Sequence, residues 1–270
     1  MQKKYFIPPG LSTDDLSAKL LKAYTELQEA NEKLIHEEQM RTEMFANISH
    51  DLRSPITAIR NSIEYLSSAA SVTQEELATA LQLLNRKILN LESLINDIFL
   101  LTTVENTNIP FHLEHLELGM YLEEYFFSCE ADKKYSKRHL ILDVPEHFPY
   151  TVSVDIDRFN RVLDNLFTNA LKYSSENASI ILGARLSSND KKVIISIKDT
   201  GIGIPSDSIS KIFERSYTVS SARTPDSSGT GLGLSIAKTI MERLNGEIWC
   251  ESKEGIGSTF YLSLPILDYV

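Results

Sequence analysis

The sequence predicts a chain with two fold classes, an all-α helical hairpin followed by an α/β sandwich. Residues 11–68 contain no glycine and a single proline, Pro55, which predicts one long helix. Residues 73–104 carry a second helical pattern after a short polar turn. Beyond residue 110, short alternating segments mix with helical ones and end in two hairpin-like strands. This mixed order favours a sandwich over a doubly wound sheet.

Along the first helix, apolar or near-apolar positions recur in alternating steps of four and three, which is a heptad pattern. Polar residues weaken this stripe, which consists of Leu20, Tyr24, Leu27, Asn31, Leu34, Glu38, Arg41, Phe45, Ile48 and Leu52. Residues 1–41 are therefore predicted to be a lead-in helix in a parallel coiled coil, whose register a buried Asn31 would fix. A single amphipathic helix packed on its own domain is the alternative.

The helix predicted over 73–104 keeps the same alternation, with Leu77, Leu81, Leu84, Ile88, Leu91, Ile95 and Ile98. Two long helices joined by a short turn form an antiparallel hairpin, which we assign to residues 42–106. Its apolar seam is wider than one partner helix can cover. We therefore expect two chains to pack into a four-helix bundle, so that the protein is a homodimer.

His50 lies in the first helix between the apolar residues Ile48 and Leu52, and Asp51 follows it directly. On a helix these apolar neighbours lie on other faces, so the imidazole is expected to point outward from the bundle. Pro55 removes the amide that would bond the Asp51 carbonyl, which predicts a bend. A carboxylate can fix the imidazole tautomer and leave the other nitrogen as a nucleophile. A lone His-Asp pair also occurs often on solvated surfaces.

Residues 105–110 are predicted to be a linker, and residues 111–268 a second domain. The predicted strands of this domain span 140–144, 151–154, 179–186, 192–199, 246–252 and 258–264. The predicted helices span 116–129, 157–173 with Asp157 as its cap, and 232–244, with a helical turn at 209–213. The Ser-rich segment 220–229 is expected to be a mobile loop.

One face of the helix predicted over 157–173 is polar. Asn165, Asn169, Lys172 and Tyr173 fall at i, i+4 and i+7/i+8, which is one continuous face. Such a face offers an amide oxygen for Mg²⁺, a cation for phosphate oxygens and an aromatic ring beside a purine. An ordinary solvated helix face would show the same pattern. The residues expected to leave this face for the core are Phe159, Leu163, Leu166 and Leu171.

Asp199 ends a predicted strand and is followed by Gly201 and Gly203. The carboxylate could accept a hydrogen bond from an adenine amino group, and the glycines let the backbone approach a flat ligand. A simple turn often has the same residues. The segment is not a dinucleotide-binding fingerprint, because Pro205 stands where the helix of that motif should run and the third glycine is missing.

Alternating glycines precede the helix predicted over 232–244, in the order Gly229, Thr230, Gly231, Leu232 and Gly233. They expose amides at a helix start, where the helix dipole favours an anion. No GK[ST] sequence is present, so this segment is not a P-loop. It predicts a phosphate contact.

These motifs follow one another in the order and spacing of the bacterial sensor histidine kinases. The segments resemble the H, N, G1, F and G2 boxes of that family, in turn residues 50–55, 165–173, 199–203, 212–215 with Phe213, and 229–233. The resemblance covers about residues 42–265. It implies a dimerisation and phosphotransfer hairpin followed by an ATP-binding domain of the Bergerat (GHKL) type, shared with Hsp90, MutL and type II topoisomerases.

By this resemblance, His50 is the phospho-accepting nucleophile and Asp51 its activating carboxylate. Members that also dephosphorylate their partners carry Thr or Asn four residues after the histidine, where this chain has Ser54. Many members have Glu and Thr where Asp51 and Ser54 stand, so the functional groups are kept while the side chains differ. Ser54 could instead bond back to a helix carbonyl beside Pro55.

The resemblance also implies that ATP is bound with Mg²⁺. Asn169 matches the Mg²⁺ ligand, Asn165 and Lys172 match residues at the phosphates, and Tyr173 matches a residue beside the base. Asp199 matches the adenine-reading aspartate. The remaining matches are Gly201 and Gly203 as the pocket floor, Gly229, Thr230, Gly231, Leu232 and Gly233 as the hinge of the ATP lid, Thr259 behind the adenine, and Arg223 reaching the γ-phosphate.

The function expected from these matches is that of an ATP-dependent protein-histidine kinase. It would phosphorylate itself on His50 and pass the phosphoryl group to an aspartate of a response regulator. A GHKL ATPase or serine kinase is one rival reading, against which the intact motif around His50 counts. A catalytically dead dimeric scaffold is another, against which Asn169, Asp199 and the lid glycines count.

Composition narrows the class further. The net charge of −10 argues against a nucleic-acid partner. No apolar run is long enough to cross a bilayer and no signal peptide is visible, so the chain is expected to be cytoplasmic. It would be either the cytoplasmic portion of a membrane-anchored sensor or a kinase that receives its input from another protein. Cys129 and Cys250 lack metal-type spacing and are expected to be free core thiols.

Overall fold

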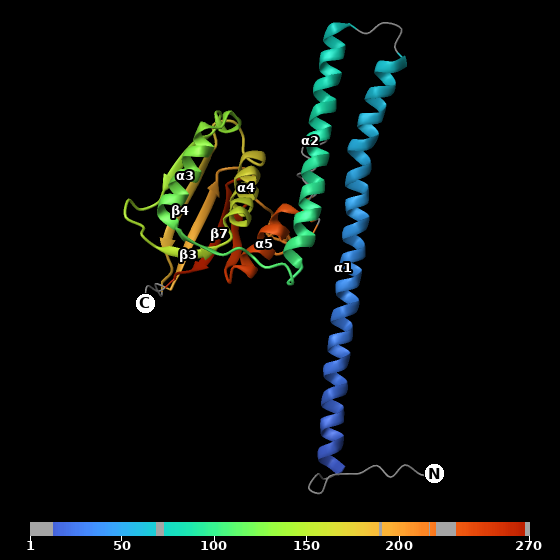
Figure 1. The fold of residues 1–270 in the computed structure, drawn as a ribbon, viewed down its shortest axis with the longest axis vertical. Helices are drawn as coiled ribbons and strands as arrows, with labels where there is room; N and C mark the ends of the chain where they lie inside the picture. The colour runs from blue at the N-terminus through green and yellow to red at the C-terminus, as the bar shows by residue number, and fades with distance from the viewer. Residues whose placement is uncertain (1–12, 69–72, 189–190, 216, 220–230, 268–270) are drawn as a thin grey trace. The chain divides into compact units, whose positions relative to one another are not determined.

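The computed structural model describes residues 13–68, 73–188, 191–215, 217–219 and 231–267 (Figure 1). The chain divides into two compact units, Met1–His50 and Asp51–Val270, so the boundary falls inside the first helix. No helix in the described ranges combines the length and the apolarity that a membrane span requires.

Helix α1 (Thr13–Ser68) is continuous through Pro55, so the prediction of one long first helix is confirmed. The bend expected after His50 stays a prediction. In the N-terminal unit, Leu20, Tyr24, Leu27 and Leu34 of the heptad stripe are between 57% and 71% exposed. A single chain thus leaves these side chains in water, which is the condition that a second helix would relieve. The coiled coil itself stays a prediction.

Helix α2 (Gln74–Glu105) begins with a capping box. The Thr73 hydroxyl accepts a hydrogen bond from the Glu76 amide at 3.2 Å, and the Glu76 carboxylate accepts one from the Thr73 amide at 2.9 Å. Two backbone donors that the helix cannot satisfy are thereby paired. The apolar side chains that α2 leaves exposed include Leu77, Leu81, Ile88, Ile95 and Phe99.

The predicted α/β sandwich is confirmed. A five-stranded sheet has the order β2 (His139–Asp143), β4 (Ser179–Leu186), β5 (Lys192–Asp199), β7 (Gly257–Pro265) and β6 (Glu247–Lys253). Only the β2–β4 pair is parallel. A second, two-stranded sheet pairs β1 (Glu114–Glu117) with β3 (Thr151–Val154). The antiparallel order explains why the strands alternate between buried and half-buried residues.

Helices α3 (Leu118–Ala131), α4 (Ile156–Lys172) and α5 (Gly233–Arg243) form one layer against this sheet (Figure 1). The core between the layers is filled by side chains that are fully buried, among them Phe159, Leu163, Leu166, Phe167, Ile180, Leu182, Ile195, Ile197 and Leu262. Cys129 is buried and Cys250 half-buried, and both are free thiols as predicted.

Several predicted element boundaries were wrong. Residues 116–117 belong to β1, because their backbone pairs with β3 instead of starting a helix. The cap of α4 is Asp155 and not Asp157, since the Asp155 side chain accepts from the Arg158 amide. The helical turn predicted at 209–213, by contrast, lies within consecutive turns over 206–213, where the Ile212 amide donates to the Ser208 carbonyl at 3.1 Å. Leu171 is only half-buried, whereas Phe167 fills the core. The loop expected at 220–229 lies outside the described residues.

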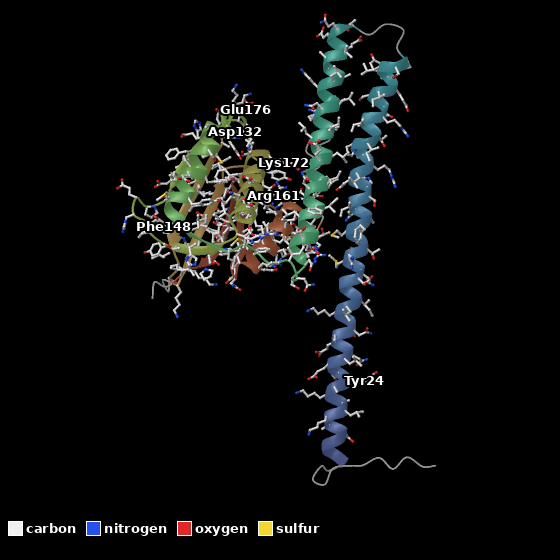
Figure 2. All side chains as sticks on the ribbon, viewed as in Figure 1. Tyr24, Asp132, Phe148, Arg161, Lys172 and Glu176 are labelled. Atoms are coloured by element: carbon white, nitrogen blue, oxygen red, sulfur yellow. The ribbon has the colours of Figure 1, made fainter. Side chains whose placement is uncertain are left out.

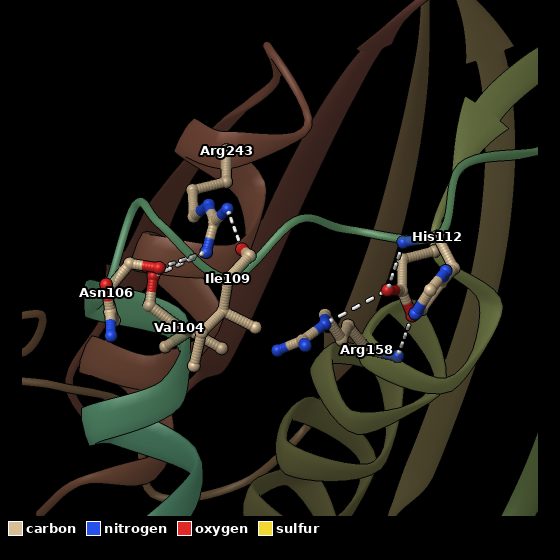
Figure 3. Close-up of polar contacts among 7 residues, drawn as sticks. Val104, Asn106, Ile109, His112, Arg158 and Arg243 are labelled. Carbon is tan, nitrogen blue, oxygen red and sulfur yellow. Dashed lines mark hydrogen bonds and ion pairs between the residues drawn. The ribbon is translucent and has the colours of Figure 1, made fainter.

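The linker after α2 is held by Arg243 of α5 (Figure 3). Its guanidinium donates hydrogen bonds to the carbonyl oxygens of Val104 at 3.1 Å, Asn106 at 3.4 Å and Ile109 at 2.7 Å. The last carbonyls of a helix have no partner within it, so a cation there satisfies them and matches the helix dipole. Arg243 therefore caps α2 from a helix more than a hundred residues away in sequence.

Phe111 and His112 attach the next part of the linker. The guanidinium groups of Arg243 and Arg158 lie 3.9 Å and 4.3 Å from the centroid of the Phe111 ring. The His112 amide donates to the Asp155 carboxylate at 3.0 Å, and the same carboxylate pairs with Arg158 (Figure 3). The linker is thus attached to the surface of the α/β sandwich.

Candidate functional site

A cleft of about 830 Å³ opens between α4, the segment after β5, the start of β7 and the face of α2. This volume suits a small-molecule ligand. The cleft collects residues that are far apart in the sequence. Those that the sequence predicted and that line it are Asn165, Asn169, Lys172, Tyr173, Asp199, Gly203, Gly231 and Gly233.

The polar wall of the cleft comes from α4. This helix turns its apolar face into the core, which leaves Asn165, Asn169 and Lys172 on the cleft side. The Asn165 amide donates to the Gly233 carbonyl at 3.0 Å and so ties α4 to the start of α5. The Lys172 ammonium lies 4.9 Å from the centroid of the Tyr173 ring. The wall therefore presents amides, one ammonium and one aromatic ring along the same face.

Asp199 lies at the end of β5 and is only 5% exposed. Burial raises the pKa of its carboxyl group, and hydrogen bonds from the backbone amides of Gly201 and Ser258 partly oppose that rise. The Gly201 amide donates to Oδ1 at 2.8 Å. A buried carboxylate held by backbone donors can accept a further hydrogen bond from a ligand amino group.

The segment after Asp199 closes tightly, and two glycines permit it. A Cβ at Gly201 would lie 2.3 Å from the Tyr173 carbonyl oxygen. Gly203 has φ +68°, and a Cβ there would lie 2.1 Å from the Lys253 carbonyl oxygen. The Ile202 amide also donates to the Tyr173 carbonyl at 3.0 Å. A larger residue would push the backbone away from Tyr173 at Gly201 and away from Lys253 at Gly203, which explains both glycines. Gly203 lines the cleft and Gly201 does not, and their role as the floor of a nucleotide pocket stays a prediction.

The structure corrects the prediction for Thr259. Ser258 and Phe260 line the cleft, and Thr259 between them does not. Successive side chains in a strand point to opposite faces, and Thr259 pairs with the exposed residues Lys198 and Glu251 on the other face of the sheet. Ser258 pairs with Asp199 in the strand register. Ser258, and not Thr259, therefore faces the cleft beside Asp199, and a contact of either residue with a base stays a prediction.

The predicted lid hinge is described only in part. Gly229, Thr230 and Arg223 lie outside the described residues. Gly231 has φ +65° and lines the cleft, as does Gly233 at the first turn of α5. The Leu232 side chain is fully buried and contributes to the core instead of the cleft wall.

Sequence reasoning missed several cleft residues. One group comes from α2, where Asn90, Ser93 and Asp97 fall at i, i+3 and i+7 and form a polar stripe. That spacing was visible in the sequence, although it did not reveal which surface the stripe faces. Phe260 was also missed; its ring packs edge-on against Phe213, with 6.4 Å between centroids. The other apolar lining residues include Ile202, Ile204 and Ile212.

The residues predicted for phosphotransfer lie on α1. His50, the last residue of the N-terminal unit, is exposed. Asp51 and Ser54 begin the second unit, the former half-buried and the latter exposed. Ser54 follows His50 by one helical turn, which is the spacing at which side chains of one helix become neighbours. Their roles stay predictions.

Comparison with known proteins identifies both parts of the chain. Residues 40–107 match the family model of the His Kinase A (phospho-acceptor) domain. Residues 154–268 match that of the Histidine kinase-, DNA gyrase B-, and HSP90-like ATPase. The sensor histidine kinase WalK of Bacillus subtilis is 34% identical over 228 residues. The chain belongs to the bacterial sensor histidine kinases.

The chain covers only part of the length of its relatives. The match to Bacillus subtilis WalK spans 84% of this chain and 37% of the relative. A sensor protein kinase WalK of Staphylococcus aureus is 35% identical over 228 residues, which is 84% of this chain and 54% of the relative. The solved structure of histidine kinase ThkA in complex with response regulator protein TrrA has a TM-score of 0.69, with 23% identity over 91% of this chain and 66% of that chain. This last similarity supports the fold.

The cleft has polar groups of the kinds that an ATP-binding domain uses. The buried Asp199 carboxylate lines it together with the amides and the lysine of α4. No group of three or more His, Cys, Asp or Glu side chains in the described ranges is arranged to hold a metal ion. Mg²⁺ usually keeps several waters and takes few protein ligands when substrate phosphates supply the others. A single amide oxygen from Asn169 fits that mode of binding.

Proposed function

We propose that this chain is the kinase core of a two-component sensor. It binds ATP in the cleft, transfers the γ-phosphoryl group to His50, and passes it to an aspartate of a response regulator. The buried Asp199 at one end of a polar cleft carries this proposal, because it supplies a fixed acceptor for an adenine amino group. The phospho-acceptor family match over residues 40–107 supports His50 as the receiving residue.

The nucleotide would be held by residues of the second unit. Asp199 would accept from the adenine amino group, Tyr173 would flank the base, and Gly201 and Gly203 would let the backbone close around it. Asn165 and Lys172 would contact the phosphates. The amides of the lid hinge, Gly229, Thr230, Gly231, Leu232 and Gly233, would lie over the phosphates as the family resemblance implies.

Asn169 would hold Mg²⁺ through its amide oxygen. When bound, the ion neutralises charge on the phosphate oxygens. The protein's own contribution is to position the phosphates and to supply the Lys172 cation beside them.

His50 would act as the nucleophile. The Asp51 carboxylate would accept a hydrogen bond from the protonated Nδ1 of the imidazole. This would leave the lone pair of Nε2 available for attack. Nε2 would attack the γ-phosphorus in line, the bond to the β-phosphate oxygen would break, and ADP would leave. The phosphoramidate on His50 would then be attacked by a carboxylate of the response regulator, forming an acyl phosphate and restoring the imidazole.

The functional unit is proposed to be a homodimer. The side chains Leu77, Leu81, Ile88, Ile95 and Phe99 of α2 are each more than 40% exposed in one chain. A second hairpin that covered this row would build the four-helix bundle expected for the phosphotransfer domain. No nucleic-acid partner is proposed, in keeping with the net charge of −10.

Radiolabelled ATP with Mg²⁺ tests the proposal. The wild-type protein is expected to acquire an acid-labile, alkali-stable label. His50→Gln should abolish the label and keep ATP binding by calorimetry, because acceptor and cleft lie in different units. Asn169→Ala should lose ATP–Mg²⁺ binding and the label together. A His50→Gln protein labelled at the wild-type rate would remove His50 from its role, and unchanged ATP–Mg²⁺ affinity in Asn169→Ala would contradict the cleft assignment.

A further inference from the structure

An ion pair joins α2 to α4 at the edge of the cleft. The Arg161 guanidinium bonds the Asp97 carboxylate, and both residues line the cleft. The Asp97 side chain is 8% exposed and that of Arg161 34%. Removing one partner of such a pair costs stability, because the charge that stays behind is partly desolvated and loses an opposite charge beside it.

Arg161 extends the polar wall of α4 by one turn. It precedes Asn165 by four residues and Asn169 by eight, so the three share one helical face. The Tyr173 carbonyl accepts a hydrogen bond from the Ile202 amide in the segment after Asp199, so Tyr173 lies at the end of α4 where the base is proposed to bind. Figure 2 labels Lys172, the last residue of α4, and Arg161, which lies further toward the start of the same helix. A nucleotide whose base lies at Asp199 would direct its phosphates along this wall toward Arg161.

Carboxylate and phosphate oxygens bind a guanidinium in the same way, often with two parallel hydrogen bonds. The Asp97 carboxylate therefore binds the Arg161 guanidinium, which is the group that a terminal phosphate would bind. Asp164 also lines the cleft, but its carboxylate accepts a hydrogen bond from the Tyr125 hydroxyl at 2.9 Å and no ion pair with Arg161 is seen for it in the described residues. A phosphate and Asp97 cannot both take the full set of Arg161 donors.

We propose that Arg161 binds the terminal phosphate of ATP, and that this phosphate displaces the Asp97 carboxylate from the Arg161 guanidinium. This inference rests on the proposed binding of ATP in the cleft. ATP then weakens the attachment of α2 beside the cleft, whereas ADP, which lacks the γ-phosphate, leaves the ion pair intact. By linkage, attachment of α2 weakens ATP binding by the same factor. Opening is local, because Arg215 holds Glu105 at 2.6 Å and Arg243 holds the end of α2.

The first test compares nucleotide affinities by calorimetry with Mg²⁺, using a non-hydrolysable ATP analogue and ADP. Asp97→Asn, which releases Arg161, should tighten the ATP analogue by about threefold to tenfold and leave ADP unchanged. Arg161→Gln should weaken the ATP analogue by about tenfold with little change for ADP, as expected for one charge-assisted contact. Arg161→Lys should retain part of the preference for the ATP analogue over ADP. Glu176→Gln, which removes an exposed ion pair with Lys137, is the matched control.

The second test measures hydrogen exchange in α2. Amides of residues 90–101 should exchange faster with the ATP analogue than with ADP, and Asp97→Asn should remove this difference. Equal effects of both variants on the two nucleotides, or none, would reduce the pair to a structural contact and overturn the inference. Failure of the wild-type protein to bind either nucleotide would instead contradict the proposed function. The two failures are thus distinguishable.

Discussion

At the scale of the residue, Asp199 is a carboxyl group whose burial lowers the stability of the folded protein and which we propose binds the adenine amino group. Its carboxylate is nearly buried, and burial raises its pKa despite hydrogen bonds from two backbone amides. A charged group in such a place destabilises the folded protein relative to a neutral one. Its retention is explained if a ligand amino group uses the carboxylate as acceptor.

Asp199→Asn is predicted to separate stability from binding. The amide keeps an oxygen for the Gly201 donor and removes the buried charge, so the ligand-free protein should melt at a higher temperature at neutral pH. Adenine nucleotide affinity should fall by about tenfold or more, because the acceptor for the amino group is lost. Calorimetric melting and titration of the same samples check both parts.

The pH dependence of this variant follows from the direction of the shift. The raised pKa means that folded Asp199 holds a proton at pH values where the unfolded chain has released it. The folded wild-type protein therefore recovers stability as the pH falls through that raised pKa. The advantage of Asp199→Asn should be full above the raised pKa and vanish below the ordinary one. An advantage that grew on acidification would contradict the assignment.

Ser54 carries a separate prediction about the reverse reaction. Its hydroxyl lies one helical turn after His50 and is exposed, so it could position water for attack on the acyl phosphate of the regulator. Serine lacks the β-methyl that restricts the rotamer of threonine. Ser54→Thr is expected to raise regulator dephosphorylation and Ser54→Ala to abolish it, with autophosphorylation nearly unchanged. Equal dephosphorylation rates in all three proteins would leave Ser54 without this role.

At the scale of the element, α4 was predictable from its own sequence. The period of its apolar residues located both the helix and its polar face, because one strong amphipathic pattern fixes which side enters the core. Its cap was predicted two residues late, since Asp155 and Asp157 both suit a helix start and only the backbone course selects Asp155. In β7, a choice between adjacent residues likewise required the strand register, which assigns Ser258 to the cleft.

The linker was predicted as a segment but not as a structured one. Residues 105–110 are mostly polar and turn-forming, and their attachment depends on Arg243, more than a hundred positions later. No local pattern records such a contact. The same limit hid the pairing of Asp97 with Arg161, whose partners lie 64 positions apart.

Arg243→Gln is predicted to loosen the linker. The neutral amide cannot reach all three carbonyl oxygens or stack as a cation on Phe111. Exchange of the Ile109 and His112 amides should accelerate by about tenfold, as expected for losing charge-assisted hydrogen bonds. Lys238→Gln, on the exposed side of the same helix, is the control and should leave these amides unchanged. Wild-type protection of Ile109 in Arg243→Gln would refute the capping role.

At the scale of the whole molecule, the order of elements was largely predictable. The helical hairpin, the linker and the sandwich follow from glycine content, apolar period and strand alternation. The strand missed at 114–117 is short and pairs only with β3, so it has little local signal. The two long helices leave rows of apolar side chains exposed to water in a single chain. We propose that dimerisation buries them.

The division of labour between an acceptor on α1 and a nucleotide cleft in the second unit is the central claim. It is tested most directly by locating the phosphoryl group after incubation with ATP and Mg²⁺, using tandem mass spectrometry under neutral conditions that preserve phosphoramidates. The predicted result is a single modified residue, His50, whose phosphoryl group disappears when a cognate receiver domain is added. Modification of a serine, threonine or tyrosine, or ATP turnover without any modified residue, would contradict the account.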